Sequence, residues 1–140
     1  MARQASVLVA DEIYYNLSGK AILHGVYHGD ITILQDPSSP IQLVFYFMAE
    51  ADLTAPFESL IAEVKLPGST AVRESVGLIS PDTNKNKNAG CLERAFYRHP
   101  LLVRMPTLRP GRIDVKMIHE SGEIIVGAPS IRLMRSIIPT

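Results

Sequence analysis

Cysteine, tryptophan and long hydrophobic runs are scarce or missing in this chain of 140 residues. Cys91 is the single cysteine, so one chain forms neither an intramolecular disulfide nor a cysteine-based metal cluster, and a reducing compartment fits. The densest apolar run, residues 44–49, is far shorter than the roughly 20 residues of a membrane-spanning helix. The apolar stretch in residues 1–10 is too short for a signal peptide. We therefore expect no export signal and no transmembrane segment.

Net charge is also missing, because 14 basic and 14 acidic residues cancel. A net charge of zero gives no indication that the protein binds nucleic acid or an anionic membrane. Its distribution is uneven: residues 1–70 hold three basic and eight acidic residues, and residues 71–140 hold eleven and six. Two charged faces would suit head-to-tail contacts between copies. Sheets pair strands that are distant in sequence, however, which favours oppositely charged strands alternating within one surface.

Ten prolines and nine glycines cut the chain into strand-length pieces and exclude long helices. The pattern predicts an all-β fold of about eight strands, with turns at residues 16–19, at 67–68 and at Ser121-Gly122. The expected extended segments are 6–15, 20–27 continuing to 31–34, 41–50, 57–66, 70–79, 92–105, 112–119 and 123–134. A helix over 49–66 is the alternative, disfavoured by Pro56 and by the period of two that follows it.

Apolar residues occupy both parities of 41–49, which predicts a central strand or a strand with one face in an interface. Residues 57–66 alternate, so Leu60 and Val64 are expected inward and Glu63 on a solvated face. The predicted core is Val7, Val9, Leu43, Phe45, Phe47, Leu60, Val64, Val76, Leu78, Ile113, Val115, Met117, Ile124 and Val126. We expect one antiparallel β-sandwich domain over 1–140, with a short C-terminal tail at 136–140.

The segments that end and open the first strands resemble a known kind of protein. Ala10-Asp11, Gly19-Lys20, Gly25-Val26-Tyr27 and the strand after Pro40 are similar to small bacterial and phage-associated β-sandwich proteins without an assigned activity. The segment 110–115 and the hairpin after it resemble the closing hairpin of immunoglobulin-like or C2-like sandwiches. The resemblance departs at 80–99. It implies a fold and a bacterial or phage setting, and these motifs bear on no chemistry.

Motifs that suggest chemistry are weak. His24 and His28 would lie about 13 Å apart on a strand at ~3.3 Å per residue, too far to share a metal ion. The loop 82–93 partly matches a calcium loop but has Lys87 where glycine is needed. Cys91 lies near basic residues, yet lone cysteines usually serve packing. We expect no catalytic residue, no cofactor and no metal site.

An arginine series marks the second half of the chain. Phe96 and Tyr97 stand within it and superficially suggest base stacking, but no lysine stripe, tryptophan or net positive charge accompanies them. The more ordinary interpretation is that the arginine stems cover apolar sheet surface and their heads meet acidic residues.

These features lead us to expect a non-catalytic module that acts by protein-protein assembly, with its own copies or on a larger particle. A phage virion accessory or decoration role is one instance, which would place it in a bacterial cytoplasm or a virion. The alternative is an enzyme or small-ligand-binding protein with a loop-built site containing residues such as Asp82, His99 and His119. The candidate assembly surface comprises Arg94, Arg98, Arg104, Arg109, Arg112, Ile137 and Ile138.

Overall fold

The computed structural model describes residues 3–34, 41–78, 94–105, 109–127 and 130–134, and within them the protein is all-β with no helix. No helix in this part of the chain is therefore long and apolar enough to cross a membrane. Eleven strands of four to twelve residues and one of two residues form four hydrogen-bonded sheets, more than the eight or so predicted, because predicted segments such as 6–15 and 123–134 each divide into two strands. The strands are β1 (Gln4–Ala10), β2 (Glu12–Tyr15), β3 (Ala21–His24), β4 (Ile31–Leu34), β5 (Ile41–Asp52), β6 (Leu60–Lys65), β7 (Val72–Ser75), β8 (Arg94–Met105), β9 (Gly111–Arg112), β10 (Asp114–His119), β11 (Gly122–Val126) and β12 (Ser130–Met134).

The first sheet has the order β1-β5-β8 and is antiparallel throughout. β5 is its central strand, which confirms the interpretation of its apolar residues on both parities. Phe45 and Phe47 are fully buried on one face, and Val44 and Tyr46 are buried on the other. A strand flanked on both sides satisfies its backbone internally and tolerates apolar residues on both faces.

The second sheet has the order β11-β10-β6-β7 and is also antiparallel. The predicted hairpin turn is confirmed, with Glu120 and Ser121 at its tip and Gly122 opening β11. The predicted strand over 57–66 is confirmed in shortened form as β6, and the helical alternative over 49–66 does not form.

The third sheet, in the order β4-β12-β9, departs from the antiparallel prediction because β12 pairs with β4 in parallel. The predicted single strand over 123–134 is also wrong. β11 ends at Val126, and β12 joins a different sheet. Asp30 helps to position β12, since its carboxylate accepts a hydrogen bond from the Ser130 N–H at 3.1 Å and pairs with Arg132 at 2.6 Å.

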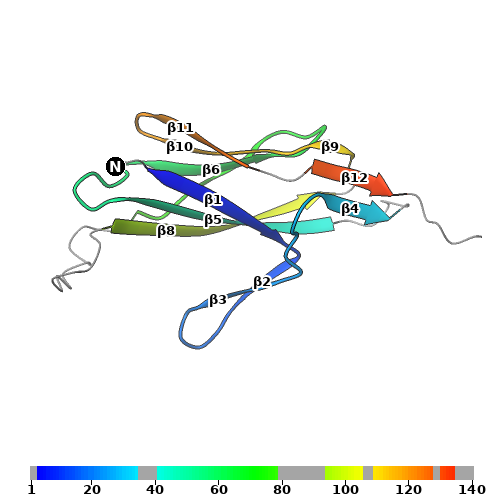
Figure 1. Ribbon diagram of the computed structural model, residues 1–140, viewed down its shortest axis with the longest axis horizontal. Coiled ribbons are helices and arrows are strands. Elements are labelled where there is room, and N and C mark those ends of the chain that lie inside the picture. Colours follow the sequence, from blue (N-terminus) through cyan, green and yellow to red (C-terminus); the bar gives the residue numbers. More distant parts are fainter. Residues whose placement is uncertain (1–2, 35–40, 79–93, 106–108, 128–129, 135–140) are drawn as a thin grey trace, which may run out of the picture.

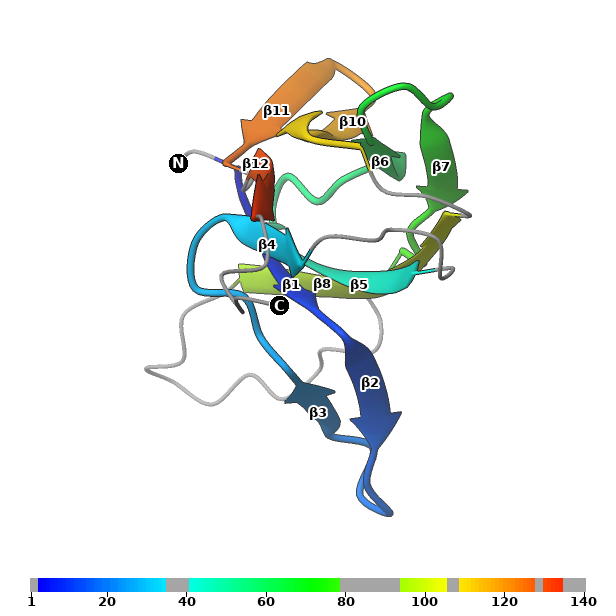
Figure 2. The ribbon, with the colours of Figure 1, turned by 90° about the vertical axis from the view of Figure 1, so that its right-hand side faces the viewer.

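The two larger sheets lie opposite each other, with β1, β5 and β8 on one side and β6, β10 and β11 on the other (Figures 1 and 2). Buried apolar residues of both sheets, such as Phe47 and Met117, form one core cluster. The hairpin β2–β3 extends away from both layers (Figure 2). It is the only two-stranded sheet in the described part of the chain.

Most of the predicted core is confirmed. Val7 and Ile124 are partly buried and pack against it. The prediction that Leu78 belongs to the core is wrong, because its side chain is 46% exposed. The N–H of Val76 makes a hydrogen bond with the Leu60 carbonyl, and the chain then leaves the sheet, so alternation no longer sets the direction of Leu78. The residues confirmed as buried are Val9, Leu43, Phe45, Phe47, Leu60, Val64, Val76, Ile113, Val115, Met117 and Val126.

Candidate interaction surfaces

The projecting hairpin β2–β3, here called the arm, begins at a sharp bend after β1. Asp11 occupies the bend, and its N–H donates to the carbonyls of His24 and Gly25 at 3.0 and 3.2 Å. The Tyr27 N–H donates to the Val9 carbonyl at 2.9 Å, so the chain that returns from the arm is attached to β1. These bonds set the direction in which the arm leaves the sheet.

Gly25 and Tyr27 hold Asp11 in place at the base of the arm. Gly25 has φ +68°, a conformation that favours glycine, and a Cβ there would stand 2.3 Å from Asp11 Oδ2, so any larger residue would displace the Asp11 carboxylate. The Tyr27 hydroxyl donates to Asp11 Oδ1 at 2.5 Å. Burial and this hydrogen bond raise the pKa of Tyr27 to about 12, so the hydroxyl stays protonated and keeps donating at any physiological pH.

The two faces of the arm differ in exposure. Ile13 and Leu23 are half-buried on one face. Tyr15 on that face is exposed, but it is partly covered and lies close enough to Tyr46 of β5 that burial first, and Tyr46 second, raise its pKa. The opposite face is exposed and carries Glu12, Tyr14, Ile22 and His24. The Tyr14 hydroxyl donates to Glu12 at 2.7 Å, and the Tyr14 ring meets the His24 ring edge-on at 5.3 Å. Large apolar groups thus face solvent on a hairpin that has only two strands.

The tip of the arm is ordered by its own polar groups. Asn16 Oδ1 accepts hydrogen bonds from the N–H groups of Ser18 and Lys20 at 3.0 and 2.9 Å, and Gly19 adopts φ +81°. The Leu17 side chain stands fully exposed on this turn. Neither outer edge of the arm pairs with another described strand. Isolated two-stranded hairpins are marginal in water, and open edges favour pairing with other chains.

The second surface is the side of the β1-β5-β8 sheet that faces away from the core, here called the outer face. It is formed by the even-numbered residues of the three strands, because neighbouring residues alternate between faces. Val44 and Tyr46 are buried where β2 contacts β5. Along β8 the face is open: Phe96 and Leu102 are 53% and 50% exposed, and Arg98 and Arg104 are exposed beside them.

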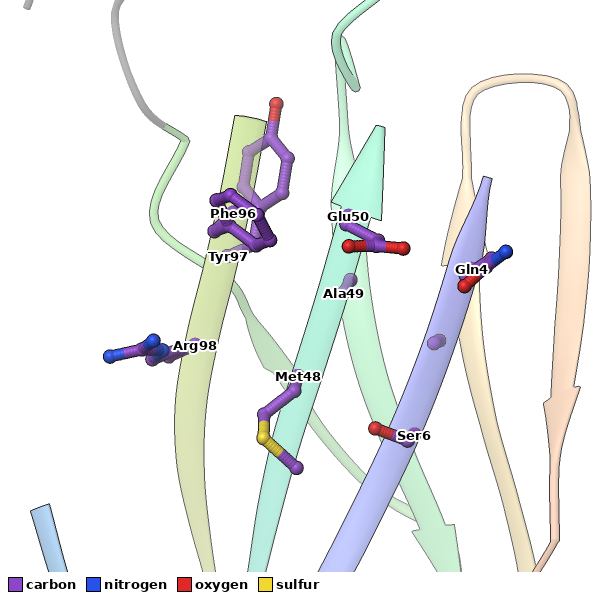
Figure 3. Close-up of a pocket in the computed structure, with 9 residues that line it drawn as sticks. Gln4, Ser6, Met48, Ala49, Glu50, Phe96, Tyr97 and Arg98 are labelled. Carbon is purple, nitrogen blue, oxygen red and sulfur yellow. The ribbon is translucent and has the colours of Figure 1, made fainter. Parts of the chain in front are cut away.

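A hollow of about 390 Å³ lies at one end of the outer face, with side chains from all three strands around it (Figure 3). Met48 and Phe96 provide apolar walls, and Glu50 and Arg98 provide charges of opposite sign. It is lined by Gln4, Ala5, Ser6, Met48, Ala49, Glu50, Phe96, Tyr97 and Arg98. A site that has two apolar walls among polar and charged groups suits an apolar side chain with a charged neighbour.

The arginines of the candidate assembly surface do not form one cluster. Arg94 is only 10% exposed and pairs with Glu50 at 3.2 Å and Asp52 at 2.9 Å on β5. Arg98 and Arg104 lie on the outer face, as described above. The remaining two are exposed elsewhere, Arg109 over the turn at Gly68 and Arg112 on β9. Ile137 and Ile138, with the rest of the tail, lie outside the described residues.

The ion pairs support the interpretation that oppositely charged strands alternate within one surface. Basic residues of the second half pair with acidic residues of the first, as Arg94 does with Asp52 and Arg132 with Asp30. Glu63 is the buried example and corrects the expectation of a solvated position. Its side chain is 8% exposed between Arg73 and Lys116, with Lys116 Nζ at 3.3 Å. Burial raises the pKa of Glu63, but these two cations outweigh burial and lower it overall.

A further ion cluster joins the N-terminus to the β10–β11 turn. Arg3 pairs with Glu120 at 2.9 Å and lies over the Phe57 ring at 4.5 Å. The Glu58 N–H donates to Glu120 Oε2 at 2.9 Å. This N–H bond, together with Arg3, lowers the pKa of Glu120 to about 2, against the upward effect of desolvation. The carboxylate therefore stays charged well below neutral pH.

The other sequence candidates are placed separately. His99 Nε2 and Glu74 Oε1 are 2.7 Å apart between β8 and β7, whereas His119 Nδ1 accepts from the Ser121 N–H at 3.2 Å. His24 meets the Tyr14 ring edge-on, and His28 is exposed in a bend. Asp82, Cys91 and the loop 82–93 lie outside the described residues. The sequence predicted the turn at 16–19 but did not predict that the arm projects from the two larger sheets. The alternation of apolar and polar residues is the same in a hairpin that projects and in one that lies within a sheet.

No protein-family model matches the chain, and no curated protein matches its sequence. The interpretation of the two surfaces therefore depends on their geometry and chemistry.

Proposed function

We propose that this protein is a non-catalytic module that acts by protein-protein assembly, with its own copies or on a larger particle. The observation that carries the proposal is the arm: a protruding hairpin with Leu17 fully exposed, Tyr14 and Ile22 exposed on one face, and open edges within the described part of the chain. Exposed apolar groups on a protruding element are costly in water and gain free energy when a partner covers them.

We also propose that the fold is an antiparallel β-sandwich of the immunoglobulin-like or C2-like kind. The two larger sheets lying opposite each other, with one core cluster between them, support this. A phage virion accessory or decoration protein is one instance of an assembling sandwich. That role would place the protein in a virion or in the cytoplasm of a bacterial cell.

The rival function, a small ligand site or an enzyme built from loop residues, has less support. His99 and His119 take part in separate hydrogen bonds, and Asp82 lies outside the described residues. The hollow on the outer face contains a carboxylate and a guanidinium, yet Arg94 already pairs with that carboxylate, Glu50.

The test is the absolute mass of the full chain in solution, measured by light scattering after size exclusion over a wide range of concentration and salt. We expect a mass above that of one chain that rises with concentration. Replacing arm residues 12–24 by a short Gly-Ser linker should remove the higher mass and leave the β circular dichroism signal. A strict monomer at every concentration would contradict self-assembly.

A further inference from the structure

The arm and the outer face complement each other in apolar character. Leu17 stands fully exposed on a turn ordered by Asn16, and the hollow offers apolar walls at Met48 and Phe96. The arm cannot fill the hollow of its own chain in this way. Its base is fixed by Asp11 and Gly25, and the face with Tyr14 is turned away from its own sheet, since Tyr15 on the other face lies beside β5.

The spacing of the two surfaces also agrees. From Leu17 at the tip to Glu12 at the base is five residues, or about 16 Å at ~3.3 Å per residue. From Arg98 beside the hollow to Arg104 on β8 is six residues, or about 20 Å by the same rise. An arm laid along β8 with its tip in the hollow therefore brings its base to the region of Leu102 and Arg104.

Charge complementarity points the same way. With Leu17 in the hollow, Lys20 at the tip approaches Glu50, whose side chain stays 30% exposed beside its pairing with Arg94, and Glu12 at the base approaches Arg104. Tyr14 and Ile22, exposed between them on the arm, then meet the half-exposed Leu102. Opposite charges at both ends of an apolar strip set the direction of docking as well as its position.

From these observations we propose that the arm of one copy docks along β8 on the outer face of a second copy, with Leu17 entering the hollow between Met48 and Phe96. This inference rests on the proposed function and names the partner as a second copy of the chain. Because the arm and the outer face are different surfaces, the contact forms either a two-fold dimer in which each arm docks on the other copy, or a head-to-tail closed ring or open chain of copies.

The first test separates the docking site from assembly in general. Leu17→Asp places a charge against the apolar walls at Met48 and Phe96 and should weaken self-association at least about tenfold, the loss expected when a buried leucine contact is removed. Ile125→Asp is the matched control, because Ile125 is 83% exposed on β11 of the other sheet. Light scattering should give this control the association of the unaltered protein.

The second test maps the contact directly. In a chain whose only cysteine is replaced by Cys91→Ser, one preparation carries Leu17→Cys and another carries Met48→Cys. A short bis-maleimide added to the mixture should link the two chains in high yield. Mixing the Leu17→Cys chain with an Ile125→Cys chain should give only background linking. Mass spectrometry of the linked peptides identifies the pair.

A charge exchange tests the direction of docking. Glu12→Arg alone should weaken association, and adding Arg104→Glu in the same chain should restore it. If the unaltered protein associates but Leu17→Asp has no effect and the Met48 pair links no better than the control, the docking inference is overturned while the proposed function stands. If the unaltered protein stays monomeric at every concentration, both the inference and self-assembly are overturned.

Discussion

Substituting Gly25 by alanine should destabilise the protein more than the same change at Gly19. Both glycines have positive φ, +68° and +81°, so alanine at either site incurs the left-handed backbone cost of about 1–2 kcal/mol. A stiffer unfolded chain offsets part of that cost, by about 0.4–1 kcal/mol. A Cβ at Gly19 meets no atom within 4 Å, so Gly19→Ala should cost about 1 kcal/mol in total.

At Gly25 the added Cβ would stand 2.3 Å from Asp11 Oδ2, so the carboxylate must turn away and release the Tyr27 hydroxyl. A hydrogen bond to a charged group contributes about 1.5–3 kcal/mol when buried, and less here because the Asp11 side chain is exposed. We therefore expect Gly25→Ala to cost about 2–3 kcal/mol, roughly 1–2 kcal/mol more than Gly19→Ala.

Urea denaturation of the two variants measures this difference. An ultraviolet titration of the tyrosines supplies a second readout. The pKa of Tyr27, about 12, reflects burial first and the Asp11 hydrogen bond second, so it should fall in Gly25→Ala and stay unchanged in Gly19→Ala. Equal destabilisation by the two substitutions, with the Tyr27 pKa unmoved in both, would refute the assigned role of Asp11.

Three further predictions concern buried and paired polar groups. Tyr97→Phe should cost about 1–2 kcal/mol in thermal unfolding, because the Phe57 N–H loses its acceptor at 3.2 Å inside the core; an unchanged midpoint would contradict this. Arg73→Ala should lower the free energy of unfolding by only about 1 kcal/mol, because the Arg73 side chain is 60% exposed although Glu63 is buried. The same substitution should raise the pKa of Glu63, as measured by NMR titration. A cost of several kcal/mol would show that the pair is fully desolvated. The pKa of Glu120 is lowered to about 2 from 4.5, so its stabilising effect is present above about pH 4.5 and is lost as pH falls toward 2. The stability gap between the unaltered protein and Glu120→Gln should close over that range, and a gap independent of pH would count against the ion cluster.

Local patterns predicted the strands well where one face is buried. The alternation that places Leu60 and Val64 inward holds, and so does the central position of the strand with apolar residues on both parities. Alternation failed at Leu78, where the chain has already left the sheet, and at Glu63, which is covered by cations from two neighbouring strands. Exposure of a polar side chain depends on its cross-strand neighbours, which alternation does not reveal.

The arginine series shows the same limit. The sequence treats Arg94, Arg98 and Arg104 as one group because they lie close along the chain, but the pairing of β8 with β5 places Asp52 directly across from Arg94. That register turns Arg94 into an internal ion pair and leaves Arg98 and Arg104 exposed. The outer face therefore presents Arg98 and Arg104, and Arg94 does not belong to the exposed surface that the sequence predicted.

The sequence by itself determined the all-β character, most strand positions and the turn at the tip of the arm, because these follow from a period of two and from residues that favour turns. Only the tertiary structure decided the parallel pairing of β4 with β12, the burial of Glu63 and the direction of the arm. Each of these depends on contacts between residues far apart in the chain, such as Asp30 with Ser130 or Val9 with Tyr27. Side-chain alternation is a local property of the backbone, whereas strand pairing is selected by the packing of the whole chain.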